Sequence, residues 1–201
     1  LMTGVFPGIA MVLIGAIAFA SGWRPTVLDA SQLLVLPVLS VAFTAAMVLH
    51  VLTLGVFFLI ALALIFYGLR LKDPLARVTG TGRPSNLLGV VLLLLAWGYP
   101  GFLDGHAPQW SLVAAPMGVL PAPTLLLLLG CSALLSSFGS RSWSVVVGGA
   151  AVVYGLVGWL YLGVWLDAAL VLGGIAVMAQ AVASAARFDG AYRSQRSGGS
   201  A

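Results

Sequence analysis

Apolar segments about as long as a bilayer-crossing helix occupy most of this 201-residue chain. Hydrophobic residues make up 61% of it and charged residues only 7%, whereas a soluble domain carries roughly 25% charged residues. The hydrocarbon core of a bilayer is about 30 Å thick and requires about 20 apolar residues of helix. We therefore expect an all-α, polytopic integral membrane helix bundle whose surface contacts the lipid bilayer.

Seven segments fit this length once the long apolar run after residue 32 is divided by a tight hairpin near His50. The first segment is not preceded by basic residues, which does not favour a cleavable signal peptide. The predicted transmembrane domain, residues 1–186, contains the spans 4–23, 32–49, 54–70, 86–103, 121–138, 142–161 and 164–186. The polar, Gly- and Ser-rich residues 187–201 are predicted to form a disordered cytoplasmic tail.

Basic residues follow only the odd-numbered spans. None lies in the N-terminal segment or in the links after spans two, four and six. Because positive charges are retained on the cytoplasmic side, a multi-pass protein of the cell inner (plasma) membrane is predicted, with the N-terminus outside and the C-terminus in the cytoplasm. Tryptophans near the span ends, including Trp143 at an inner end, are expected to form an aromatic belt. The nine basic residues are Arg24, Arg70, Lys72, Arg77, Arg83, Arg141, Arg187, Arg193 and Arg196.

Several chemistries lack the residues they need. The only lysine, Lys72, lies in a link, which excludes a retinal Schiff base within the bundle. No charged residue falls near the middle of a span, whereas proton and ion pumps usually bury such groups there. No hydrolytic, nucleotide-binding or redox-thiol motif is present, so no enzymatic activity is assigned. No basic stripe with interleaved aromatic residues points to nucleic acid.

Polar side chains gather at the predicted outer face, and both histidines of the chain are among them. His50 ends span two and His106 follows span four. Two imidazoles at similar depth could ligate a haem iron, or could hold a transition metal such as zinc or copper together with Asp104. Alternatively, His50 closes a hairpin and Asp104 and His106 end a helix in the headgroup region without any ligand. The outer polar set is His50, Thr53, Tyr99, Asp104, His106, Gln109, Tyr161 and Asp167.

Small residues recur at four-residue spacing within the spans, which allows helix backbones to approach closely. Spans six and seven are expected to pack as a close pair, and Gln180 is expected to make an interhelical hydrogen bond. The small-residue pairs are Gly4 and Gly8, Ala151 and Gly155, Ala169 and Gly173, and Ala179 and Ala183.

Short motifs occur in a fixed order between residues 32 and 130. They are Leu49-His50, Tyr99-Pro100, Gly105-His106 followed by Pro108, and Gly118 followed by Pro121-Ala122-Pro123-Thr124. In these residues the chain resembles a family of bacterial polytopic membrane proteins catalogued only as a domain of unknown function, with Tyr-Pro, Gly-His and Pro-Cys-Pro-Thr elements. Ala122 stands where that family has cysteine, so no role of the thiol carries over. The resemblance implies a functional His50–His106 pair and no particular activity.

The predicted function follows from what the chain lacks and from its small-residue helix faces. With little extramembrane mass and no catalytic motif, it is expected to dock against membrane protein partners. The prediction is an accessory or scaffolding subunit of a larger respiratory or photosynthetic membrane complex. Two alternatives stay open: a stand-alone haem- or metal-binding membrane protein with the His50–His106 site, and a small-molecule transporter.

Overall fold

The computed structural model describes residues 26–70, 83–103, 117–135 and 140–197, and in this part of the chain the protein is all-α. The helices confirm the predicted fold class at this level. They are α2 (Val27–Met47), α3 (Val51–Arg70), α4 (Arg83–Leu103), α6 (Pro121–Leu134), α7 (Arg141–Tyr161) and α8 (Asp167–Ser197).

Three of these helices are long and apolar enough to cross a membrane. The segments are Leu28–Met47, Val51–Leu69 and Arg141–Tyr161, of 20, 19 and 21 residues. Shorter apolar helical segments cover Pro84–Tyr99, Pro121–Leu134 and Asp167–Ala183. Large apolar side chains are exposed along the helices, as expected for a protein that associates with a membrane. The first predicted span, residues 4–23, lies outside the described residues, so the count of seven stays a prediction.

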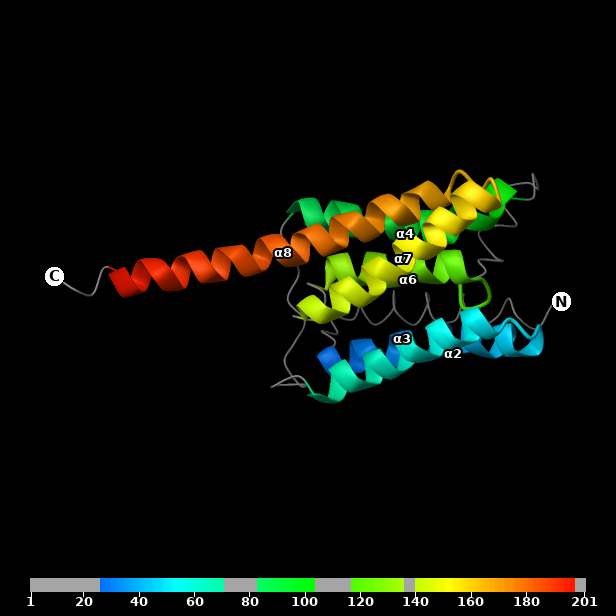
Figure 1. Cartoon of the computed structure of the whole chain (residues 1–201), viewed down its shortest axis with the longest axis horizontal. Helices are drawn as coiled ribbons and strands as arrows, with labels where there is room; N and C mark the ends of the chain where they lie inside the picture. The colour runs from blue at the N-terminus through cyan, green and yellow to red at the C-terminus, as the bar shows by residue number, and fades with distance from the viewer. Residues whose placement is uncertain (1–25, 71–82, 104–116, 136–139, 198–201) are drawn as a thin grey trace, which may run out of the picture.

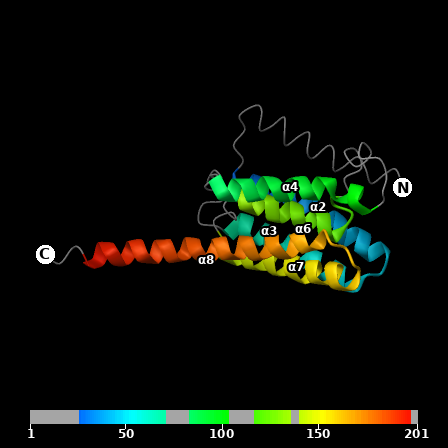
Figure 2. The same cartoon turned by 90° about the horizontal axis from the view of Figure 1, so that it is seen from above.

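The described helices form three antiparallel pairs, α2 with α3, α4 with α6, and α7 with α8 (Figure 1). The predicted hairpin near His50 is confirmed: α2 ends at Met47 and α3 begins at Val51. Leu49 in this turn has a φ of 56°, a left-handed conformation that is uncommon for a side-chain-bearing residue. Figure 2 shows α4 and α6 running beside the other two pairs in one bundle.

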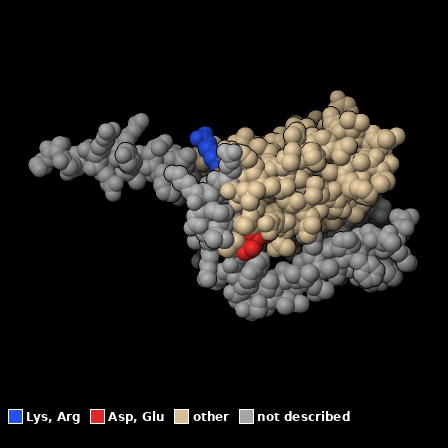
Figure 3. Space-filling model, turned by 90° about the horizontal axis from the view of Figure 1, so that it is seen from below, with Lys and Arg blue, Asp and Glu red and all other residues tan. Residues whose placement is uncertain are grey.

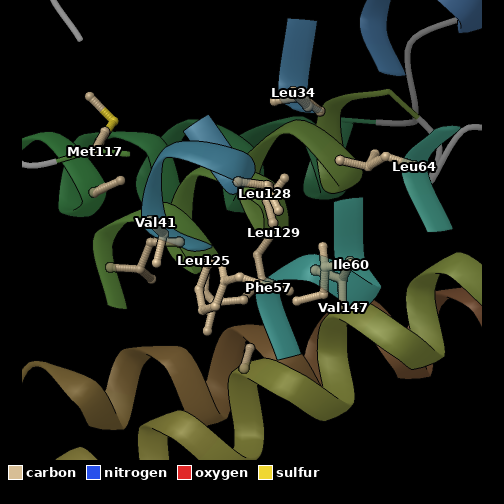
Figure 4. Packing of buried hydrophobic residues seen from close by; sticks show 14 of the residues in the cluster. Leu34, Val41, Phe57, Ile60, Leu64, Met117, Leu125, Leu128, Leu129 and Val147 are labelled. Carbon is tan, nitrogen blue, oxygen red and sulfur yellow. The ribbon is translucent and has the colours of Figure 1, made fainter. Parts of the chain in front are cut away.

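Helix α6 lies at the centre of the bundle, in contact with α2, α4, α7 and α8. Its side chains Leu125, Leu128 and Leu129 are fully buried. Figure 4 shows them close to Val41 of α2 and Phe57 of α3. Since lipid is as apolar as leucine, dense packing holds such a core together more than exclusion of water does.

The face of α7 toward α8 is lined by small residues, Gly148, Ala151, Gly155 and Gly158, which we call the glycine seam. All four are buried. A Cβ atom on Gly148 would lie 2.8 Å from the carbonyl oxygen of Gly174 in α8, too close for any real side chain. The predicted close packing of spans six and seven is therefore confirmed.

The other predicted small-residue pairs of α8 do not contribute to this seam. Gly173 faces the side chains of Leu92 in α4 and Leu129 in α6. Ala179 and Ala183 are exposed. The regular spacing in the sequence identified the residues but not the direction in which each one points.

The basic residues of the described helices lie at one end of the bundle. Arg70 ends α3, whereas Arg83 and Arg141 begin α4 and α7, and the antiparallel pairing brings these helix ends together. On the face drawn in Figure 3, the described charged side chains appear only near the end from which α8 projects. Helix α8 continues through residues 187–197, and the disorder predicted for this tail stays a prediction.

Candidate functional site

Of the three predicted ligands, only His50 lies within the described residues. It is exposed in the turn before α3, and its Nδ1 atom lies 2.9 Å from the hydroxyl oxygen of Thr53. Asp104 and His106 fall outside the described residues, so their meeting with His50 stays a prediction. Elsewhere in the described chain no group of three or more His, Cys, Asp or Glu side chains could hold a metal ion.

The His50 ring is oriented by a short hydrogen-bonded chain that reaches α7. The hydroxyl of Tyr154 donates to Thr53 Oγ1 at 3.2 Å, and Thr53 in turn holds His50 Nδ1. Because Nδ1 is occupied, a metal or haem iron could reach only Nε2. A hydrogen bond on the second ring nitrogen is typical of metal-bound histidines, although it does not by itself make one.

A second polar pair at the same end of the bundle is fully enclosed. The hydroxyl of Tyr99, in the last part of α4, donates to Asp167 Oδ1 at 2.6 Å. Both residues are only 4% exposed. An O–H···O contact this short is typical of a hydrogen bond to a charged acceptor. The sequence placed both residues at the outer face but did not pair them, because nothing in it shows which face of each helix turns inward.

The glycine seam makes room for Asp167. Its carboxylate packs directly against Gly158, where a Cβ atom would overlap Oδ2. Its backbone carbonyl oxygen lies 2.8 Å from the position of a Cβ on Gly155. The first turn of α8 therefore fits into a notch in α7 that any larger residue would close.

The Gly118 to Thr124 motif builds the start of α6. The backbone N–H of Gly118 donates to Thr124 Oγ1 at 2.8 Å, and that hydroxyl donates to the carbonyl of Leu120. Gly118 has a φ of +85° and packs against Pro37 of α2, so a side chain there would be strained. Pro121 occupies the first helical turn, where its missing N–H costs nothing. These motif residues have a structural role.

Hydrogen bonds also link helices near the opposite, basic end. Trp143 Nε1 of α7 donates to Ser132 Oγ of α6 at 2.9 Å, and Trp143 is fully buried. It therefore does not belong to the aromatic belt that the sequence predicted. Ser85 of α4 donates to Gln180 Oε1 of α8 at 2.9 Å, which confirms the interhelical hydrogen bond expected for Gln180.

Comparison with known proteins found no relative of this chain. No protein-family model matches the chain, and no curated protein or solved structure is similar to it. The resemblance to a family of unknown function stays a prediction. The roles of Tyr99, Asp167 and Thr124 rest on the geometry of this chain alone.

Proposed function

We propose that this chain is an accessory or scaffolding subunit of a larger respiratory or photosynthetic membrane complex. In this proposal it is a seven-span protein of the bacterial inner membrane, with its N-terminus outside and its C-terminus in the cytoplasm. The collection of Arg70, Arg83 and Arg141 at one end of the bundle supports this orientation, because basic residues favour the cytoplasmic side. The apolar surface of the described helices supports a place within the bilayer.

Single cysteines at the two ends of the bundle test the orientation. Leu49 is 85% exposed in the α2–α3 turn, and Ser142 is exposed at the start of α7. In a Cys131→Ala background, an impermeant thiol reagent added to intact cells should label Leu49→Cys and should label Ser142→Cys only after the membrane is opened. Labelling of both from the same side would refute the topology.

The observation that carries the subunit proposal is the outward face of α3. Leu52, Leu59 and Leu62 are 68%, 65% and 46% exposed there, and they surround Gly55. No described atom outside its own helix lies within 4 Å of a Cβ built on Gly55. A glycine in a helix interior costs about 0.5–1 kcal/mol relative to alanine. Between large apolar side chains it forms a notch that a helix of another membrane protein can enter. We call these four residues the α3 stripe.

Photo-crosslinking in native membranes tests the α3 stripe directly. A photoreactive amino acid replaces Leu59, and in a matched variant it replaces Val153, which is 58% exposed on α7. The Leu59 variant should form an adduct with one other membrane protein, whereas the Val153 variant should react with lipid. Lipid adducts alone at both positions, or adducts only with a second copy of this chain, would refute the proposal.

A haem or metal protein is the second candidate, favoured by the ordered ring of His50. If His50 and His106 hold a ligand, the purified protein carries a haem absorption band or a transition metal in nearly one-to-one ratio. Replacement of either histidine by alanine should remove it. A colourless and metal-free protein purified from native membranes would leave His50 with only its turn-closing role.

A further inference from the structure

We infer that Asp167 and Tyr99 form a proton-binding site where α4, α7 and α8 meet. The ligand is a proton that one carboxylate oxygen of Asp167 takes from water at the outer end and later returns. One O–H bond of a hydronium ion breaks as the O–H bond of the carboxylic acid forms, release reverses both changes, and the Tyr99 hydroxyl keeps its own proton. The inference does not depend on the identity of any partner.

Opposing influences act on the charge of Asp167. Its 4% exposure disfavours the ionised form, because a buried carboxylate loses its hydration. The hydroxyl of Tyr99 and the N-terminal end of α8 both favour the ionised form. No cation among the described residues contacts Asp167 and fixes it in the charged state. Because a neighbouring cation would favour the ionised carboxylate, its absence among the described residues leaves Asp167 able to take up a proton.

Few groups of the described residues face Asp167. From α4 it meets Tyr99, and from α7 it meets Gly155 and Gly158, which do not titrate. Of the two tyrosines of α7, Tyr154 is bonded to Thr53 of α3 and Tyr161 is 85% exposed. Helix α6, which also packs against α8, has no acidic or basic residue between Pro121 and Leu134.

The α7–α8 turn beside the site is exposed in the described structure. Leu162 and Trp165, just before the start of α8, are 72% and 78% exposed. Asp167 itself lies in the first turn of α8, so the enclosed carboxylate is only two residues from an exposed side chain. In this proposal, water reaches Asp167 through the turn.

Infrared spectroscopy of the full chain across pH tests the inference. The sequence has no glutamate, so the carbonyl band of a protonated carboxylic acid can come only from the five aspartates and the C-terminus. At pH values above the range around pH 4 in which exposed aspartates titrate, acidification should produce such a band. Asp167→Asn should abolish it, and Asp29→Asn, at the basic end of the bundle, should retain it.

The Tyr99→Phe variant keeps the test decisive if Asp167→Asn does not fold. Without the hydroxyl of Tyr99 as a donor, the carbonyl band of protonated Asp167 should persist to higher pH in the variant than in the unaltered protein. A band that is absent or constant over this pH range would overturn the inference, because Asp167 would then hold a single charge state. A band that titrates identically in Tyr99→Phe would overturn the pairing of the two residues.

Discussion

The glycine seam of α7 and the α3 stripe use the same residue type in opposite ways. A Cβ atom on Gly148 or Gly158 would lie less than 3.0 Å from atoms of α8, whereas a Cβ atom on Gly55 would have no described atom outside its own helix within 4 Å. The seam lets two helices of one chain close on each other. The stripe leaves a notch on the outer surface. Whether a small residue in a membrane helix serves packing within the chain or contact with a partner is therefore known only once its face of the helix is known.

The largest expected effect comes from filling the seam, with the adjacent glycine as control. Gly148→Leu should lower the free energy of unfolding by about 1–3 kcal/mol or more, because α8 must move away. Gly149→Leu adds the same side chain where no described atom lies within 4 Å. Thermal unfolding in mild detergent should show a clearly lower Tm for Gly148→Leu only. Equal losses in both variants would contradict the assigned direction of the seam.

The enclosed pair of Tyr99 and Asp167 comes next. Tyr99→Phe leaves an oxygen of the buried Asp167 without its donor and should cost about 1–3 kcal/mol of stability. The control Tyr161→Phe removes a hydroxyl from a residue that is 85% exposed and should change little. The comparison of the two melting temperatures checks this, and a Tyr99→Phe protein as stable as the control would show that the pair adds nothing to the fold.

A smaller loss is expected at the start of α6. Thr124→Val keeps the shape of the fully buried side chain but removes the acceptor of the Gly118 N–H. We expect about 1 kcal/mol of destabilisation, the usual net value of a hydrogen bond. Unfolding in denaturant should show it. An unchanged midpoint would mean that another group takes over the N–H of Gly118.

The smallest effect on the fold is expected in the α3 stripe. Gly55→Ala should leave the isolated protein unchanged or raise its stability by about 0.5–1 kcal/mol, because alanine favours the helix and nothing described obstructs its methyl group. A helix melting experiment in detergent measures this. A marked loss of stability would show that Gly55 packs within the chain, and the stripe would then be part of the core.

The sequence predicted the helical class and the main helix boundaries well. Length and hydropathy place α3 and α7 within a few residues, since a bilayer demands about 20 apolar residues from each span. Helix α2 begins at Val27, whereas the predicted span began at residue 32. The hairpin at His50 was also predictable, because one helix through the whole apolar run would be too long.

The candidate site was predicted less well. Tyr99 and Asp167 are far apart in the sequence and become partners only through the packing of α4 against α8. Trp143 was assigned to the membrane interface from its place at a span end, but the bundle buries it against Ser132. In both cases the place of the residue along its helix was predicted but its rotation about the helix axis was unknown, because apolar side chains cover every face of these spans.

In this account the glycine seam packs helices within the chain, whereas the α3 stripe contacts another membrane protein. Extraction of the protein from native membranes tests this difference most directly. Native electrophoresis and mass spectrometry are applied to the unaltered chain, to Gly55→Leu and to Ala179→Leu, a matched change at an exposed position of α8. The unaltered chain and Ala179→Leu should migrate in a complex with another membrane protein, and Gly55→Leu should migrate alone while remaining folded. Migration of the unaltered chain as a lone monomer or homodimer would contradict the account.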